Sequence, residues 1–188
     1  MKKILISIIA VVFVAALVVF FGGFYPVVTV DGVFVTRRVF VTAQKAGENF
    51  ANAEFQKAGM HPVDFASSDN ATLLRDIRKG VTTFLIEDRI LEEKGTSVVE
   101  GFDSKVRGRV DEVLKNNSNS GQIAQQVYGL SLEDFRTFVL EPQARRDVIA
   151  EALKANNQDF FNWLSEQKKK TSVRIFFMGF GWDGEKAN

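Results

Sequence analysis

The sequence predicts a mainly α-helical protein, in which an N-terminal transmembrane helix precedes a multi-helix body with a small antiparallel β-sheet. Three observations support this fold class. A long apolar run opens the chain, apolar residues recur every three or four positions through most of the rest, and strand-like alternation is confined to one stretch near each end of the body. We therefore divide the 188 residues into a membrane anchor (1–26), a helical domain (27–178) and a flexible tail (179–188).

The first element is the apolar segment 4–21, ILISIIAVVFVAALVVFF, which Ser7 alone interrupts. A helix of about 18 or more apolar residues can cross the hydrocarbon core of a bilayer, and Phe24 and Tyr25 are typical of the membrane interface. A cleaved signal peptide and a buried helix are the alternatives. A signal peptide usually has a shorter apolar core followed by a cleavage site with small residues, and no convincing site of that kind follows here.

Basic residues at the start of the chain predict its orientation. Lys2 and Lys3 precede the apolar run, and such flanks stay on the cytoplasmic side. We expect a single-pass protein of the cell membrane with a cytoplasmic N-terminus, contact with the lipid bilayer through residues 4–24, and an extracytoplasmic body. The strand that starts at Val27 leaves almost no linker, so the body should lie close to the membrane. The run Lys168–Lys170 suits either the negative end of a helix dipole or anionic lipid.

A β-hairpin is expected directly after the anchor. The pair Asp31-Gly32 separates two valine-rich runs, and Asp-Gly between β-branched residues is a strong signal for a tight hairpin turn. A two-stranded hairpin of this size is only marginally stable alone. Its expected partner is the strand Val173–Phe177, which alternates in the same way near the far end of the body. Pairing of this strand with Val27–Val35 would join both ends of the body.

Helical periodicity accounts for the segments between these strands. The expected helices cover residues 37–58, 71–94, 99–115, 122–128, 132–155 and 158–169. Thr36 and Ser131 supply N-cap hydroxyls, and Gly59 and Gly95 are expected to end the first two helices. Pro142 lacks a backbone N–H, so we expect it to kink or break its helix just before this residue.

The composition restricts the chemistry open to the protein. Without Lys2 and Lys3, 22 basic and 23 acidic residues leave the body near −1, which argues against a general nucleic-acid binder. The absence of cysteine excludes disulfides, cysteine-ligated zinc, iron–sulfur clusters and thiol catalysis. The single histidine, His61, precedes a proline in a predicted loop, and no P-loop or dinucleotide-binding motif is present. We therefore expect no catalytic residue, no metal and no cofactor.

Three short sequence motifs follow one another along the chain. They are Val28–Thr36 (VTVDGVFVT), Phe84–Gly95 (FLIEDRILEEKG) and Tyr128–Phe135 (YGLSLEDF). Together they resemble the opening strand–turn–strand, the central helix and the Y-G-L-S-x-E-D-F helix start of the N-terminal chaperone domain in SurA- and PrsA/PpiD-type extracytoplasmic folding factors. The resemblance covers about residues 27–170. It implies a helical domain that binds unfolded proteins.

The chain also departs from that family. Asp31 stands where the opening turn commonly has Asn, and Val39 stands where an acidic residue often completes the helix cap. Many family members carry a parvulin-type prolyl isomerase domain, and no segment here has the length or pattern of one. The resemblance therefore implies client binding without isomerase activity.

We accordingly expect a chaperone-like protein, not an enzyme, that binds unfolded or extended segments of exported proteins through apolar helical surface. Eighteen phenylalanines against two tryptophans and two tyrosines suit apolar contact. The candidate client-binding residues are Phe50, Phe55, Phe65, Phe102, Phe135, Phe138 and Phe161. Each of them has an alternative role as a core side chain. The alternative function is a membrane-proximal scaffold with one dedicated partner, and the sequence does not fix the oligomeric state.

Overall fold

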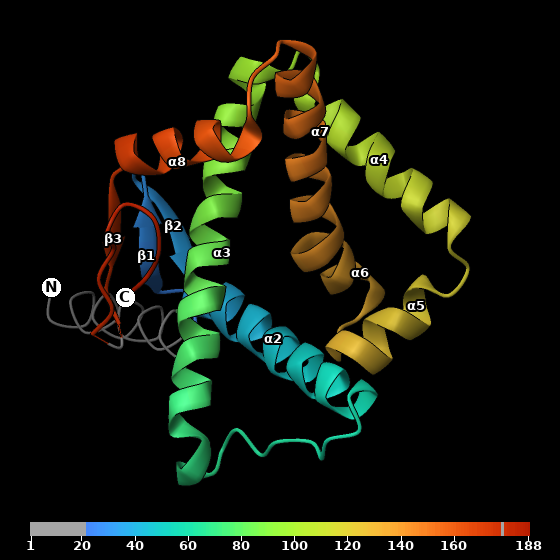
Figure 1. The fold of residues 1–188 in the computed structure, drawn as a ribbon, viewed down its shortest axis with the longest axis vertical. Coiled ribbons are helices and arrows are strands. Elements are labelled where there is room, and N and C mark those ends of the chain that lie inside the picture. Colours follow the sequence, from blue (N-terminus) through green and yellow to red (C-terminus); the bar gives the residue numbers. More distant parts are fainter. Residues whose placement is uncertain (1–21, 178) are drawn as a thin grey trace, which may run out of the picture.

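Figure 1 shows the computed structural model, which describes residues 22–177 and 179–188. Its strands are β1 (Pro26–Val30), β2 (Val33–Thr36) and β3 (Val173–Ile175). Its longer helices are α2 (Arg37–Lys57), α3 (Ala71–Val98), α4 (Phe102–Asn116), α7 (Glu141–Ala155) and α8 (Phe160–Lys170). The short helical turns are η1 (Ser68–Asn70), α5 (Ser120–Ile123), η2 (Ala124–Tyr128), α6 (Leu132–Phe135) and η3 (Arg136–Leu140). The mainly helical class that the sequence predicts is confirmed.

The predicted membrane segment, residues 4–24, lies almost entirely outside the described residues. Among the helices that the structure does describe, none combines the length and the apolar character needed to cross a bilayer.

The three strands form the predicted antiparallel sheet, in the order β2-β1-β3. Val28 in the central strand lies opposite Val35 of β2 and Ile175 of β3. Asp31 and Gly32 form the turn with positive φ angles of 47° and 87°, as a two-residue Asp-Gly hairpin turn requires. Pairing of the C-terminal strand with the hairpin is therefore confirmed, although the strand ends at Ile175.

Asp31 also ties the two ends of the body to each other. Its backbone N–H donates to the Ser172 carbonyl (2.9 Å), and its carboxylate accepts from the Ser172 N–H (2.8 Å) and from Lys94 Nζ (3.0 Å). Burial opposes ionisation, but these donors outweigh it and hold the pKa of Asp31 below its ordinary value. The carboxylate thus links the hairpin turn, the start of β3 and helix α3.

The helices surround the centre of one face of the molecule (Figure 1). Helix α3 is the longest, and it contacts both α2 and α7. From α7 the contacts continue through η3, α6 and η2 back to α2. These elements therefore form a closed frame, and α4 packs against α7 outside it.

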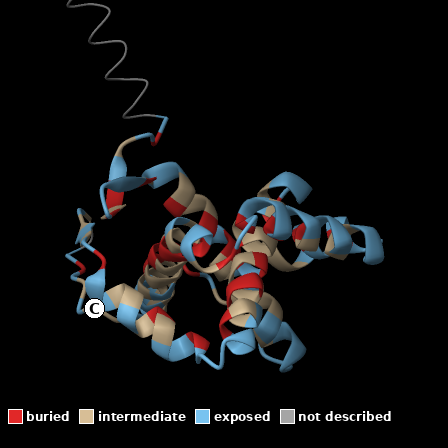
Figure 2. Cartoon of the chain, turned by 90° about the horizontal axis from the view of Figure 1, so that it is seen from above, coloured by how far each residue is buried: buried red, intermediate tan, exposed pale blue. Residues whose placement is uncertain are grey.

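Two hydrophobic clusters hold this frame together. The main core joins the sheet to the helices and includes Val28, Val30, Phe40, Ile86, Ile90 and Ile149. A smaller cluster joins α2 to η2 and α6 and consists of Ala46, Ala124, Leu130 and Phe135. Figure 2 shows the buried positions on the sides of the helices that face one another. Phe138 and Leu140 pack against both clusters and so connect them.

Helix α3 continues past the residue at which the sequence predicts its end. Gly95 lies inside the helix, which runs to Val98, and a Cβ at Gly95 would overlap the ring of Phe102. The glycine allows the start of α4 to pack closely on α3, so its role is packing instead of termination. The expected helix start at residue 99 is likewise wrong, because α4 begins at Phe102.

The irregularity expected before Pro142 takes the form of a π-helical turn. The helical elements α6, η3 and α7 follow one another without a break, and Pro142 lies in the first turn of α7. The missing N–H of this proline therefore falls where the hydrogen-bonding pattern changes from π to α. A second π-helical turn, η2, follows α5, so helix begins at Ser120 and the expected loop over 116–121 is shorter.

Residues 179–188, which the sequence assigns to a flexible tail, lie against α3 and α8 in the structure. Ala187 pairs with Trp182 in an isolated antiparallel bridge, and its N–H donates to Thr83 Oγ1 of α3 (3.0 Å). Ser165 of α8 donates to the Glu185 carboxylate (2.6 Å). Burial of the Phe180 and Ala187 side chains explains this docking, since it removes apolar surface from water.

Candidate functional site

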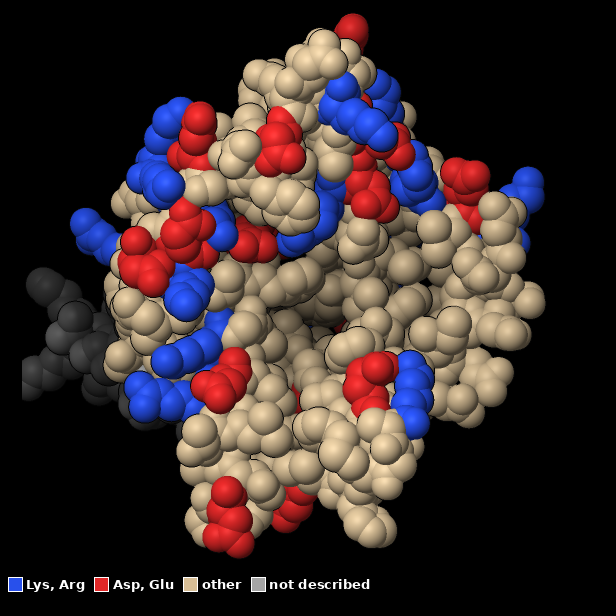
Figure 3. Space-filling view, in the orientation of Figure 1, with Lys and Arg blue, Asp and Glu red and all other residues tan. Residues whose placement is uncertain are grey.

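An open apolar groove of about 650 Å³ occupies the centre of the helical frame. Figure 3 shows the hollow on the face viewed, with mainly uncharged side chains beside it and charged side chains above and below it. Its aromatic and aliphatic lining includes Phe50, Val81, Phe84, Leu91, Tyr128, Phe138, Val139 and Leu140. Glycine and alanine positions, Ala43, Ala46, Gly47 and Gly80, widen it by leaving side-chain space empty. The groove therefore offers a mainly apolar surface, and its volume lies in the range of small-molecule binding pockets.

Helix spacing explains how α3 supplies one wall of the groove. Val81, Phe84, Asp88 and Leu91 recur at three- and four-residue intervals and so share one helix face. Ile86 and Ile90 lie on a different face, which is fully buried in the main core. Helix α3 is thus apolar on two sides, one for the core and one for the groove.

Aromatic stacking closes the far corner of the frame. The Phe50 ring of α2 stacks on Tyr128 of η2 with centroids 5.5 Å apart, and Tyr128 meets Phe135 at 5.3 Å. Asn49 Nδ2 donates to the Tyr128 carbonyl (3.0 Å), and Gly129 admits this contact because a Cβ there would collide with the Asn49 amide. Burial raises the pKa of the Tyr128 phenol above its ordinary value.

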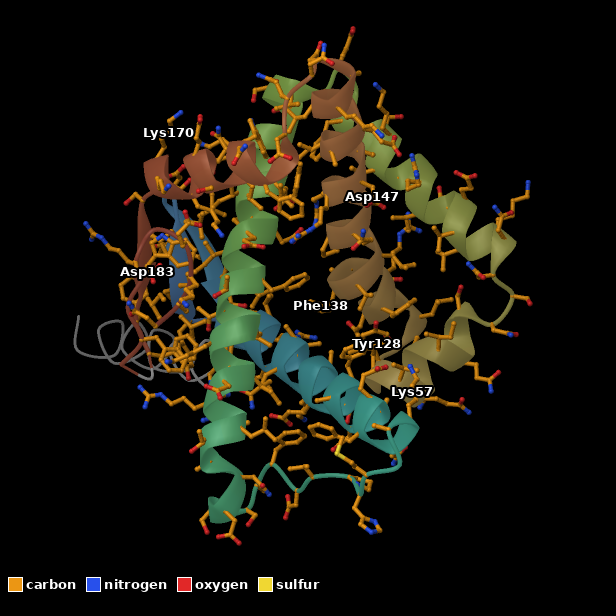
Figure 4. All side chains as sticks on the ribbon, in the orientation of Figure 1. Lys57, Tyr128, Phe138, Asp147, Lys170 and Asp183 are labelled. Atoms are coloured by element: carbon orange, nitrogen blue, oxygen red, sulfur yellow. The ribbon has the colours of Figure 1, made fainter. Side chains whose placement is uncertain are left out.

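Phe138 lies between the two hydrophobic clusters and packs against both of them. Figure 4 shows it beside the central opening, with Tyr128 below it at the α2 corner. Its side chain is only partly buried and lines the groove. This position comes from the π-helical turn η3, which carries residues 138–140 along the groove wall.

A charged pair lies where α3 crosses α7 at the groove. Arg145 Nη1 donates to both Asp88 carboxylate oxygens, at 2.8 and 3.0 Å. Burial nevertheless raises the pKa of Asp88, and the neighbouring Arg145 only partly offsets it. Glu141 and Glu92 also reach the Arg145 guanidinium, at 3.4 and 3.7 Å. The carboxylate that lines the groove is therefore already engaged.

A second ion-pair group lies beside the first. Arg146, which also lines the groove, contacts Glu87 at 3.1 Å, and Lys168 of α8 contacts the same carboxylate at 2.9 Å. The Arg146 guanidinium lies 5.8 Å from the centroid of the Phe160 ring. These contacts join α3, α7 and α8, and they leave the groove charges paired with one another.

The structure places the seven candidate phenylalanines in three different settings. Phe50 and Phe138 line the groove. Phe65, Phe102 and Phe135 are buried side chains of the interior. Phe55 is half-buried outside the groove. Phe161 of α8 is 72% exposed and forms a T-shaped pair with Phe160.

Sequence reasoning missed several groove residues, notably Phe84, Tyr128, Asp88 and Arg146. The apolar residues of α3, including Phe84, cover more than one face of the helix, and the breadth of this apolar surface is a usable signal in the sequence. No such signal exists for Tyr128 or Arg146, because their approach to α2 and α3 depends on how distant elements pack.

No protein-family model, curated protein or solved structure matches the chain. The likeness to SurA-type chaperone domains therefore stays a prediction. Within residues 22–177 and 179–188, no three or more acidic or histidine side chains are grouped so that they could hold a metal ion. What the groove can do follows from its apolar lining and its paired charges.

Proposed function

We propose that this protein is a membrane-anchored, extracytoplasmic chaperone-like protein that binds unfolded or extended segments of exported proteins in the apolar groove, without catalysing a reaction. The observation that carries the proposal is the groove of about 650 Å³ between α2, α3 and the η3–α7 segment, lined by Phe50, Phe84 and Phe138. Clients are recognised by their exposed apolar side chains.

The groove chemistry suits binding that is permissive and reversible. Fully burying one large apolar client side chain contributes about 1.5–3 kcal/mol. Association itself costs about 4–15 kcal/mol, so one such side chain is insufficient and several weak contacts are needed. Apolar contacts are non-directional, and the groove carboxylate of Asp88 is already paired, so little in the lining selects one client sequence.

The proposal is tested by substituting equivalent phenylalanines inside and outside the groove. Phe50→Asp places a charge in the groove, whereas Phe161→Asp makes the same chemical change at a more exposed site on α8. The full chain is reconstituted in nanodiscs, and aggregation of several unrelated unfolded proteins is followed by light scattering. We expect Phe50→Asp to weaken client protection about tenfold or more, since losing about 50–100 Å² of apolar contact costs about 1.3–2.5 kcal/mol. Phe161→Asp should protect like the parent chain.

A groove-filling variant separates client binding from frame stability. Gly80 lines the groove and a Cβ there meets nothing within 4 Å, so Gly80→Phe occupies the groove without removing any existing apolar group. It should reduce client protection while thermal unfolding stays cooperative. Equal protection by the Phe50→Asp and Phe161→Asp variants, or no protection of any client at stoichiometric excess, contradicts the proposal. Protection of a single client favours the dedicated-partner scaffold.

A further inference from the structure

The β-sheet presents an aromatic outer face that the groove does not use. The inner face is closed by Val28, Val30 and Val35, which are buried in the main core. The solvent side of an antiparallel sheet normally carries polar side chains. Here Phe34 is 60% exposed and Phe176 is 57% exposed.

The register of the sheet places basic and aromatic residues together on this outer face. Phe34 of β2, Thr29 of β1 and Arg174 of β3 lie opposite one another in a row across the three strands. Phe176 lies directly after the end of β3, two residues beyond Arg174, and its ring is exposed. Its N–H donates to the Val27 carbonyl (2.8 Å), which keeps it next to the start of β1.

The chain enters the sheet with a second basic and aromatic group. Arg38 N–H donates to the Gly23 carbonyl and Arg37 N–H to the Tyr25 carbonyl, at 2.9 and 3.0 Å. The Arg38 guanidinium lies 5.8 Å from the centroid of the half-exposed Phe24 ring. These backbone contacts hold the entering segment, and Phe24 with it, against the start of α2.

We define the sheet patch by its exposed side chains. They are Phe24, Phe34, Phe176, Arg37, Arg38 and Arg174. Within the described part of the chain, the three arginines form no ion pair. The nearby carboxylate of Asp31 is engaged by Lys94. The patch therefore combines apolar rings with positive charge that is not neutralised by its neighbours.

We propose that the sheet patch docks on the surface of a bilayer that contains anionic phospholipid. The proposal rests on the anchoring included in the proposed function. The apolar run ends at residue 21 and β1 begins at Pro26, so the two are at most about 17 Å apart at full extension. Aromatic rings prefer the membrane interface, and arginine side chains near the surface are attracted by anionic headgroups.

Charge disfavours the other obvious occupant, a second copy of the chain. A two-fold symmetric contact would place each patch against an identical one, so arginines would face arginines. A lipid surface instead supplies the opposite charge and an apolar layer for the rings. Docking would hold the body in one orientation on the membrane and leave the groove, on a different part of the fold, open to clients.

Single cysteines can report this orientation because the chain contains none. An environment-sensitive dye is attached in the full chain at Phe176→Cys in the patch, or at Ser118→Cys, an exposed position between α4 and α5. Figure 1 shows the ends of α4 and α5 that meet there on the side of the molecule away from the sheet. The protein is reconstituted in phosphatidylcholine vesicles with or without phosphatidylglycerol, and quenching by headgroup-labelled lipid is measured. We expect strong quenching at position 176 and background quenching at position 118.

Charge and ring variants test the two components of the patch. Arg174→Ser should reduce the ratio of docked to undocked bodies about fivefold in anionic vesicles, the factor that corresponds to one arginine near such a surface. Phe34→Ser should reduce docking in both kinds of vesicle. Because both side chains are exposed, thermal unfolding should stay at the parent temperature. Client protection should also stay unchanged, which separates the patch from the groove.

The outcomes distinguish this inference from the proposed function. If the chain floats with the vesicles but position 176 is quenched no more than position 118, docking is refuted and the anchor stands. If the chain does not float, the anchor and the docking are both refuted. Shielding of position 176 in detergent without added lipid, together with cross-linking between chains through the patch, would assign the surface to self-association instead.

Discussion

Replacing Gly95 by alanine tests the close contact between α3 and α4 most directly. In most helices this substitution is favourable, because alanine exceeds glycine in helix propensity by about 1 kcal/mol. At Gly95 the new methyl group would overlap the Phe102 ring, with even the ring's Cε2 only 2.7 Å away. Phe102 is itself buried at the start of α4, so the ring has little room to move.

The magnitude follows from comparison with a glycine that lacks such a neighbour. Overpacking a core by a methyl group typically costs about 1–3 kcal/mol. Gly108 in α4 is exposed and a Cβ there meets nothing within 4 Å, so Gly108→Ala should gain the full propensity term. We therefore expect Gly95→Ala to be less stable than Gly108→Ala by about 1–3 kcal/mol.

Urea unfolding of the full chain in detergent, followed by far-ultraviolet circular dichroism, measures this difference. The variant Phe102→Leu adds a matched test, because it removes the ring that the methyl group would strike. In the double variant, Gly95→Ala should cost less than it does alone, which a double-mutant cycle detects as coupling. Equal stabilities of the Gly95→Ala and Gly108→Ala variants would refute the packing role of Gly95.

Two further predictions concern carboxylates with shifted pKa values. Arg145→Met leaves the largely buried Asp88 carboxylate without the guanidinium that donates to both of its oxygens, and should destabilise the fold by about 3 kcal/mol in urea unfolding. Because the pKa of Asp88 is raised, stability falls as pH rises from the ordinary carboxyl pKa to the raised one, and this fall should be larger in the variant. Asp31→Asn should keep the turn but lose the ion pair with Lys94. The pKa of Asp31 is lowered in the folded protein, so its ionised carboxylate stabilises the fold above the ordinary carboxyl pKa, and this stabilisation is lost as pH falls through the lowered value. The Asp31→Asn variant has no such group, so its free energy of unfolding should decrease less in acid than that of the parent chain.

Controls make these two outcomes specific. Adding Asp88→Leu to Arg145→Met removes the unpaired charge and should restore most of the lost stability. For the turn, Asp31→Ala removes the side-chain acceptor for the Ser172 N–H as well as the charge, and should be less stable than Asp31→Asn at every pH. A variant Arg145→Met with parent stability, or an unchanged acid slope in Asp31→Asn, contradicts the corresponding assignment.

The sequence predicted those features that depend on neighbours in the chain. The Asp31-Gly32 turn depends on local backbone geometry, and Thr36 and Ser131 cap their helices through hydroxyls that accept from Val39 and Asp134 N–H groups. The same local patterns predicted the strand at Val173, and its partner followed because a hairpin alone needs a third strand.

The groove was only partly predictable. Among the candidate phenylalanines, Phe50 and Phe138 line the groove, whereas Phe102 and Phe135 are buried in the core. In the sequence the two pairs look alike, because all four are phenylalanines on the apolar face of a predicted helix. Periodicity indicates which helix face is apolar but does not indicate what covers that face. That distinction depends on whether another element reaches the ring, which is a property of the packed frame.

The sequence by itself determined the helical class and the hairpin, because turn chemistry, capping and hydrophobic periodicity act over a few residues. It also predicted the pairing of the body's first and last strands, because a lone hairpin needs a third strand and Val173–Phe177 offered the matching alternation. Only the tertiary structure decided that Gly95 lies inside α3, that residues 179–188 dock on α3 and α8, and that α2 and α7 leave a groove between two hydrophobic clusters. These features depend on contacts between residues far apart in the chain, such as Phe50 with Tyr128 and Ala187 with Thr83, whose chemistry is ordinary until packing brings them together.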